Sequence, residues 1–366
     1  MVSCPTEVRT ALDILTELAA SEELFDIHTH PFNVADSVPA YRETSPRTGI
    51  FTRGYGHYVP PDPEAKKWDE GAAGEGDGKG GDVKVDQHLV RKLYLLKSRS
   101  TYNFTGPTVL NDQMALAGIK HALLLPVARP EDKGDDQMLE MERLFGAHQN
   151  FSMGYCVPND CPTEKIVGDV GRIRNRFKVA ALKIHPNLTG IDPSCRRGLD
   201  RMHHILEASR TYRLPVIIHG GYSKEFSDGD AVSFGCLDRL VHVAWETTDQ
   251  PVIIAHAGFF GCGREEITNS GFPQLENLLV KHDHLLVDLA GLGPWVIQMI
   301  VKKIEKERIL FGSDALYFSI QSSAVHTLVA LMQTGFDAGR MFHRFAGINP
   351  ARYIFRDRTK IQAESL

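Results

Sequence analysis

Two histidines separated by a single residue end a short, mainly apolar run near the amino terminus. The run reads Leu24-Phe25-Asp26-Ile27-His28-Thr29-His30. Side chains alternate between the two faces of a strand, so His28 and His30 should project to the same side, where two imidazoles can bind one cation. The pair alone is a weak signal, because the chain has 16 histidines and most histidines serve other purposes.

Further groups able to bind metal or transfer protons stand at the ends of later apolar runs. His219 follows Val216-Ile217-Ile218, and His256 follows Val252-Ile253-Ile254-Ala255. Asp314 comes shortly after Ile309-Leu310-Phe311, and Lys183 lies within Leu182-Lys183-Ile184. Each of these residues by itself could equally be a core side chain or a helix cap.

The elements that must position these residues are eight apolar runs that alternate with segments of helical spacing. This pattern predicts repeated β-α units with a parallel sheet, and eight repeats favour a (β/α)8 barrel over an open sheet. We expect one domain, 1–366, with an N-terminal helix in 1–22 and closing helices over 336–355. The predicted strands are 24–28, 120–127, 151–157, 179–184, 214–219, 251–256, 285–289 and 308–311, and the predicted helices are 135–147, 163–176, 198–212, 235–245, 272–281, 294–303 and 321–332.

The repeat is interrupted once, over 31–108. This insertion carries aromatic and proline residues, the low-complexity run 71–81 and a helical segment over 86–99. It follows the first strand, on the side where active sites of such barrels are built, so we interpret it as a lid. The alternative is a surface excursion with no role in binding.

In a barrel of parallel strands all carboxyl ends meet on one face. The histidines, Lys183 and Asp314 would therefore converge there from five different strands. Their joint placement indicates a metal-dependent site, which no single member indicates.

The ordered set resembles the amidohydrolase superfamily, and especially its amidohydrolase-related branch, which also contains non-oxidative decarboxylases. The resemblance spans nearly the whole barrel and includes the closing run Asn349-Pro350-Ala351-Arg352. It implies that one divalent ion is bound by His28, His30, His219 and Asp314. Zinc is the first choice, because imidazole and carboxylate suit it, and manganese and iron accept the same ligands.

The resemblance also implies roles for the neighbouring residues. Asp314 would be the general base, and His256 would polarise the substrate or stabilise developing negative charge. Lys183 would be either a carboxylated bridge between two metals or an unmodified lysine facing the substrate, and the Lys-Ile-His-Pro context favours the second. A structural role is expected for His185, because it shares the side of Lys183 on the strand but lies further out. Asp288 could support a ligand histidine by accepting its hydrogen bond.

Two arginines are candidates for binding a substrate carboxylate, since a guanidinium can pair with it in a bidentate manner. Arg129 follows the second predicted strand and Arg264 the sixth. The alternative for each is a solvated loop arginine.

The function predicted from these residues is hydrolysis of an amide, ester or lactone bond. One alternative is non-oxidative decarboxylation of an unsaturated or aromatic carboxylic acid, and another is a barrel that binds metal or ligand without catalysis. The partner should be a small molecule, and the resemblance allows a homodimer.

Composition excludes several other classes. A net charge of −5 and a pI near 6.3 provide no basic field for nucleic acid. No apolar run approaches the ~20 residues that span a bilayer, and the first twenty residues predict an amphipathic helix rather than a signal peptide. The six cysteines form no paired motif, as expected of reduced thiols in the cytoplasm.

Overall fold

The computed structural model describes residues 6–31, 106–128, 135–223, 227, 229–315 and 318–355. Within these residues, eight parallel strands form one sheet whose spatial order is the order of the chain. They are β1 (Leu24–Thr29), β2 (Ile119–Leu124), β3 (Phe151–Cys156), β4 (Ala181–Ile184), β5 (Val216–Ile218), β6 (Val252–Ile254), β7 (Leu285–Asp288) and β8 (Ile309–Leu310).

The sheet curls until β8 and the residues after it meet β1. The Ile27 amide donates to the Phe311 carbonyl at 3.3 Å, and the Asp314 amide donates to the His28 carbonyl at 2.8 Å. Thr29 also forms a parallel bridge with Ala315. These contacts close the barrel directly beside the predicted site, and the (β/α)8 prediction is confirmed.

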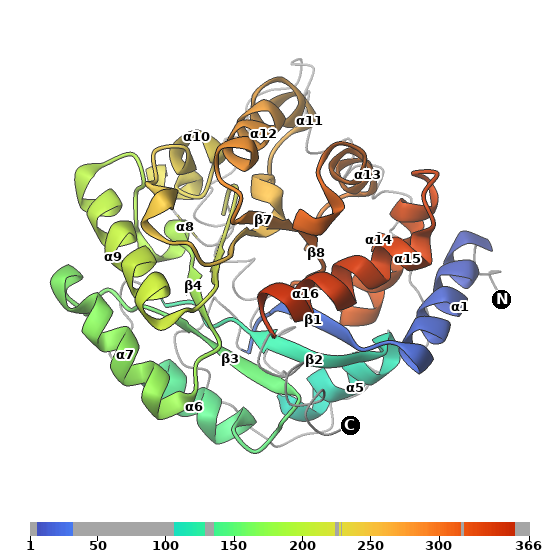
Figure 1. Ribbon diagram of the computed structural model, residues 1–366, viewed down its shortest axis with the longest axis horizontal. Helices are drawn as coiled ribbons and strands as arrows, with labels where there is room; N and C mark the ends of the chain where they lie inside the picture. Colours follow the sequence, from blue (N-terminus) through green and yellow to red (C-terminus); the bar gives the residue numbers. More distant parts are fainter. Residues whose placement is uncertain are drawn as a thin grey trace, which may run out of the picture.

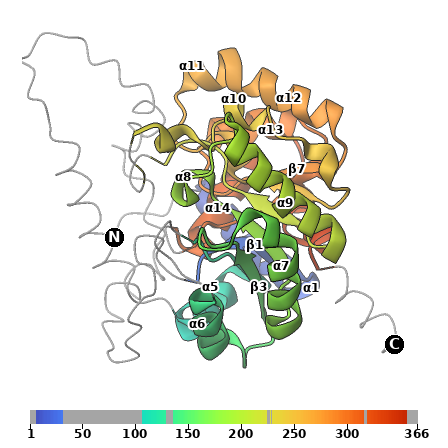
Figure 2. The ribbon, with the colours of Figure 1, turned by 90° about the vertical axis from the view of Figure 1, so that its left-hand side faces the viewer.

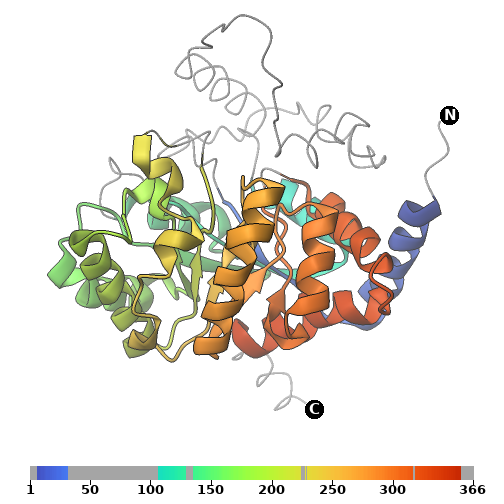
Figure 3. The same ribbon diagram turned by 90° about the horizontal axis from the view of Figure 1, so that it is seen from above.

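Helices surround the strands in a ring (Figure 1). Seen from the side, they run along the barrel wall (Figure 2). From above, green helices of the first half lie at one end and red helices of the second half at the other, next to blue α1 (Figure 3). The α-helices are α1 (Thr6–Ser21), α5 (Pro107–Ala117), α6 (Asp136–Phe145), α7 (Ile166–Phe177), α8 (Pro186–Thr189), α9 (Arg196–Tyr212), α10 (Leu237–Leu240), α11 (Arg264–Glu266), α12 (Phe272–Lys281), α13 (Pro294–Lys303), α14 (Ile320–Met332), α15 (Ala338–His343) and α16 (Asn349–Tyr353).

Alternate residues of the strands enter two apolar clusters. One set packs between strands and helices, as Leu182 and Ile184 of β4 do. The other set, with Ala181 of β4 and Ile217 of β5, fills the barrel interior together with Phe355 from the chain after α16. The Phe355 ring stacks on Phe25 at a centroid distance of 4.6 Å. The interior is therefore a packed core, and the polar groups are left to the carboxyl ends of the strands.

Two predicted segments differ from the structure. Helix α5 was not expected as a separate element, although Pro107 in its first turn and left-handed Gly118 after its last residue are the usual helix boundaries. The helix expected over 235–245 is reduced to the four residues of α10. Leu240 and Trp245 are both fully buried, yet five positions apart they would lie on different sides of one helix.

The terminal elements match the prediction more closely. Helix α1 buries Val8, Ala11 and Leu15, and it packs on α14 and α15. The chain over 338–353 forms α15, a π-helical turn (Arg344–Ile348) and α16. The predicted insertion lies outside the described residues, except for 31 and for 106–108 at the start of α5. None of the described helices is long and apolar enough to cross a membrane.

Candidate metal centre

The pairing of β1 with β2 is irregular next to His28. Phe25 and Ile27 both belong to the interior cluster, so strict alternation would place His28 on the outside. The pairing of β1 with β2 shifts register between Asp26 and Thr29, and a bulge of this kind re-aims a side chain. Asp26 supports it, because its Oδ1 accepts from the His28 amide at 3.0 Å.

Asp26 also joins β1 to the chain after β8. The same Oδ1 accepts from the Ser313 amide at 3.0 Å, one residue before Asp314. Burial raises the pKa of Asp26 to about 6, although the hydrogen bonds from Ser313 and His28 oppose this. The sequence analysis assigned no role to Asp26. Its place two residues before His28 was a signal, since short polar side chains often bind a backbone amide two positions ahead.

His28, His30 and Asp314 form one group of ligand atoms within 4.8 Å of one another. Asp314 Oδ1 lies 3.1 Å from His30 Nε2 and 3.7 Å from His28 Nε2. His30 Nδ1 lies 2.8 Å from the Leu125 carbonyl oxygen, which can only accept, so Nδ1 carries the hydrogen. In neutral His30 the Nε2 lone pair therefore faces a carboxylate oxygen. Two acceptors this close need a proton or a cation between them.

Asp314 is held in an unusual backbone conformation, with φ at 59°. A non-glycine residue in this region is uncommon and often marks a functional site. Burial raises the pKa of Asp314, but the hydrogen bond with His30 and the neighbouring imidazoles outweigh burial, so its pKa is lowered overall. Asp314 is thus suited to stay ionised beside a cation.

Asp288 at the end of β7 connects two of the histidines. Its Oδ2 lies 2.9 Å from His28 Nδ1, and its Oδ1 accepts from the His256 amide at 2.7 Å. His256 adopts φ 55°, and its Nδ1 lies 2.8 Å from the Ala290 carbonyl oxygen. The atoms of His28, His256 and Asp288 form a second group within 4.8 Å. The structure thus places Asp288 where the sequence analysis expected a partner for a histidine.

Lys183 lies inside the barrel, 1% exposed. Its Nζ is 3.3 Å from His28 Nε2. Burial lowers the pKa of Lys183 to about 8, while the nearby Asp288 and Asp314 raise it. Burial, followed by the charge of Lys183, also lowers the pKa of His28 well below its usual value. A neutral His28 has a lone pair for a cation.

His219 follows β5 as predicted, but it belongs to neither group of ligand atoms found among the described residues. Its ring stacks on His185 at 4.0 Å and 8°, and its centroid is 5.0 Å from that of His256. Burial and then His185 lower the pKa of His219 well below normal. The structure brings five of the predicted residues together: His28, His30, His256, Asp314 and Lys183. His219 lies at the edge of this set, next to the His256 ring.

One of the two arginine candidates, Arg264, lies within the described residues, and no described contact joins it to this site. Arg264 is exposed at the start of α11, where its guanidinium lies 5.1 Å from the centre of the Trp295 ring. Arg129 lies outside the described residues. Gly291 lies beside Asp314 Oδ2: a Cβ at Gly291 would lie 3.7 Å from this oxygen, 3.4 Å from Phe318 and 3.5 Å from Phe260.

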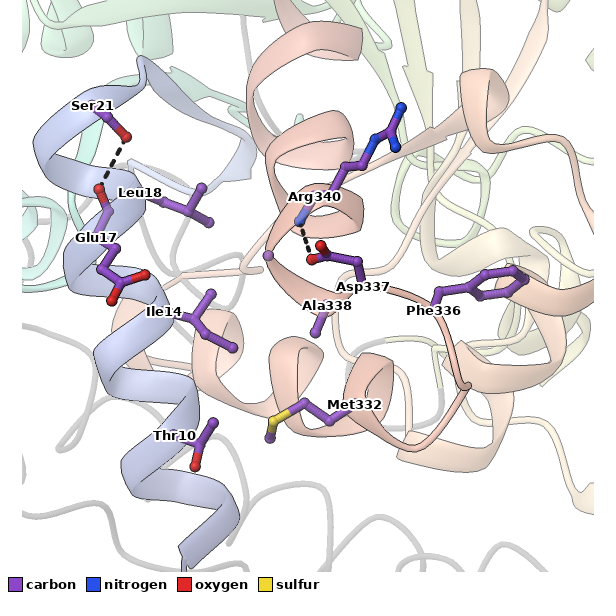
Figure 4. A pocket seen from close by; sticks show the side chains of 11 residues that line it. Thr10, Ile14, Glu17, Leu18, Ser21, Met332, Phe336, Asp337, Ala338 and Arg340 are labelled. Atoms are coloured by element: carbon purple, nitrogen blue, oxygen red, sulfur yellow. Dashed lines mark hydrogen bonds between the residues drawn. The ribbon is translucent and has the colours of Figure 1, made fainter.

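A hollow elsewhere on the molecule carries no comparable chemistry. It lies outside the barrel, where Ile14 and Leu18 of α1 face Met332 and Ala338 near the α14–α15 junction (Figure 4). Its ionisable lining residues are Glu17, Asp337 and Arg340. None of them belongs to a group able to hold a metal ion among the described residues.

Comparison with known proteins identifies the fold. No family model and no curated protein matches this sequence. IDCase of Metarhizium anisopliae is 14% identical, with 92% of this chain and 98% of that chain covered and a TM-score of 0.54. An amidohydrolase II is 14% identical (90% and 99% covered, TM-score 0.51). The 5-carboxyvanillate decarboxylase LigW of Sphingomonas paucimobilis is 12% identical (92% and 99% covered, TM-score 0.51). The amidohydrolase-type barrel that the sequence resemblance implied is confirmed.

Proposed function

We propose that this protein is an enzyme of the amidohydrolase superfamily, a metal-dependent hydrolase that acts on an amide, ester or lactone bond of a small molecule. The observation that carries the proposal is the approach of His30 Nε2 to Asp314 Oδ1 at 3.1 Å. Both atoms are acceptors when His30 is neutral, and a divalent cation between them removes the repulsion.

The donor set fits such an ion. His28, His30 and Asp314 offer two imidazole nitrogens and one carboxylate oxygen, from the ends of the neighbouring strands β1 and β8. Zinc takes these donors in catalytic sites with one position left open. Manganese and iron accept the same donors, so zinc is the first choice rather than the only one. We infer one ion, and His219 stays a predicted further ligand on the ground of its place in the sequence.

A bound divalent ion lowers the pKa of water toward about 7 and so supplies hydroxide at neutral pH. Asp314 is the proposed general base: its carboxylate would take the proton of the attacking water and deliver it to the leaving group. His256 is proposed to stabilise negative charge on the substrate. Because its Nδ1 faces the Ala290 carbonyl, it can donate from Nε2 only as the imidazolium.

Decarboxylation is the second candidate, and Lys183 favours it. A buried amine beside His28 could pair with a substrate carboxylate, and one structural neighbour is named as a decarboxylase. The same lysine fits the one-metal site as an unmodified side chain facing the substrate. A carboxylated Lys183 bridging two ions is the less favoured arrangement.

The function is tested with a panel of esters, lactones, amides and carboxylic acids, assayed with the wild type and Asp314→Asn. Hydrolysis by the wild type that disappears in Asp314→Asn, with circular dichroism unchanged, supports the proposal. The control is Asp200→Asn, which changes an exposed carboxylate on α9 and should keep full activity. Turnover that survives in Asp314→Asn with metal bound would remove Asp314 as the base. Release of carbon dioxide without hydrolysis of any other compound would establish the second candidate.

A further inference from the structure

Asp288 is a fully buried carboxylate whose two oxygens are engaged by three groups. Oδ1 accepts from the amides of His256 at 2.7 Å and Ala290 at 3.1 Å, and Oδ2 faces His28 Nδ1 at 2.9 Å. The side chain is 0% exposed. One carboxylate thus holds the backbone that carries one imidazole and the ring of another.

The position of Lys183 indicates which nitrogen of His28 carries the hydrogen. The lysine nitrogen lies 3.3 Å from His28 Nε2, and an ammonium has hydrogens to donate but no lone pair. The Asp288 carboxylate oxygen at 2.9 Å from Nδ1 is an acceptor, so both neighbours place the hydrogen of neutral His28 on Nδ1 and leave Nε2 as the acceptor. His30 and His256 have the same tautomer, because their Nδ1 atoms face carbonyl oxygens.

We propose that Asp288 is a positioning residue. It fixes His28 in the Nδ1–H tautomer, and by accepting from the His256 amide it also fixes the position of His256 relative to His28. The value of this arrangement rests on the metal site of the proposed function, because it leaves the Nε2 lone pair of His28, like that of His30, for a cation. A buried carboxylate behind a ligand histidine has this effect in metal sites generally.

The geometry opposes the other use of Asp288, as ligand to a second ion in the group with His28 and His256. Oδ1 already receives two amide hydrogens. An ion at Oδ2 would have to displace the hydrogen on His28 Nδ1. His28 would then face that ion with Nδ1 and not with Nε2, the atom proposed to bind the metal. The geometry therefore favours Asp288 as a support for His28 over Asp288 as a ligand of a second ion.

Asp288→Asn tests this directly. The asparagine oxygen can still accept from the two amides, but its amide group then meets His28 as a donor. His28 Nδ1 must accept, and the hydrogen moves to Nε2. Asp26→Asn is the matched control, since Asp26 is equally buried and accepts from the amides of His28 and Ser313 without contacting an imidazole in any described bond.

The primary readout is the ¹⁵N spectrum of the histidine rings in full-length, metal-free protein, with His28 assigned from the signals lost in His28→Gln. We expect Nδ1–H in the wild type and in Asp26→Asn, and Nε2–H in Asp288→Asn. Zinc titration of the same samples should show about a 10- to 100-fold loss of affinity in Asp288→Asn, and a clearly smaller loss in Asp26→Asn.

The outcomes separate the two proposals. Nε2–H in wild-type His28 would overturn the role of Asp288, even if the variant failed to fold. So would an unchanged tautomer in Asp288→Asn, or two zinc ions in the wild type with one lost in the variant. If the tautomer changes as expected but the wild type binds no metal ion, the positioning role stands and the metal-dependent function fails.

Discussion

The rim of the barrel has two halves that look alike in sequence and differ in structure. In the half formed by β1 and β8, His28 and His30 face Asp314 at 3.7 and 3.1 Å. In the half formed by β4 and β5, His185 and His219 stack on each other at 4.0 Å and join no group of metal-ligand atoms among the described residues. A histidine at a strand end is thus not enough. An adjacent carboxylate distinguishes the imidazoles of His28 and His30, which we propose as metal ligands.

The largest expected difference between the halves is in metal affinity. His30→Ala should lower zinc affinity by more than about 100-fold, the upper limit for residues that only support a ligand. His219→Ala should lower it less, because His219 lies outside the ligand group. Competition of each apoprotein with a chromogenic chelator measures both values. Equal losses would place His219 in the ligand set, as the sequence order predicted.

The β1–β8 half also contains Asp26, a buried carboxylate whose ionisation lowers the stability of the fold. The pKa of Asp26 is raised from 3.8 to about 6 in the folded protein, so its ionisation destabilises the fold as pH rises through this interval. Asp26→Asn cannot ionise. From pH 4 to pH 7 the metal-free wild type should lose up to about 3 kcal/mol relative to the variant. Urea unfolding of both proteins at several pH values measures this, and a difference that stays constant or grows in favour of the wild type would refute it.

The space between Gly291 and Asp314 allows a finer test. A methyl at Gly291 would occupy the space between Phe260, Phe318 and Asp314 Oδ2, so Gly291→Ala should lower kcat/KM about tenfold, as one methylene does in a tight pocket. Gly335→Ala is the matched control, because Gly335 is also left-handed, at φ +85°, and has nothing within 4 Å of its Cβ position. Both variants should lose about 1 kcal/mol of stability from backbone strain. Equal kcat/KM in the two variants would show that substrate does not pass Gly291.

The smallest effect is expected at Arg264, outside both halves. Its guanidinium lies over Trp295, so Arg264→Ala should cost at most about 1 kcal/mol of stability and leave kcat/KM unchanged. Steady-state kinetics with the active compound of the panel tests this. A large loss confined to carboxylate substrates would bring Arg264 to the site and support decarboxylation.

The sequence predicted the strands well because most of them are mainly apolar runs between helical segments, as at β6. It placed His28 and Asp314 on one rim for the same reason, since parallel strands deliver their ends to one face. It missed the register shift next to His28, because a period of two does not show where the alternation is interrupted. It also could not foresee the left-handed backbone of His256, which depends on Asp288, 32 positions later in the chain.

The most direct test of the account is the metal content of full-length protein purified without chelators, measured by mass spectrometry for the wild type and His28→Ala. The account predicts one divalent ion per wild-type chain and well below one in His28→Ala, with both proteins folded. A wild type that contains no divalent metal and binds none when supplied, or a His28→Ala protein that retains the full amount, would contradict it.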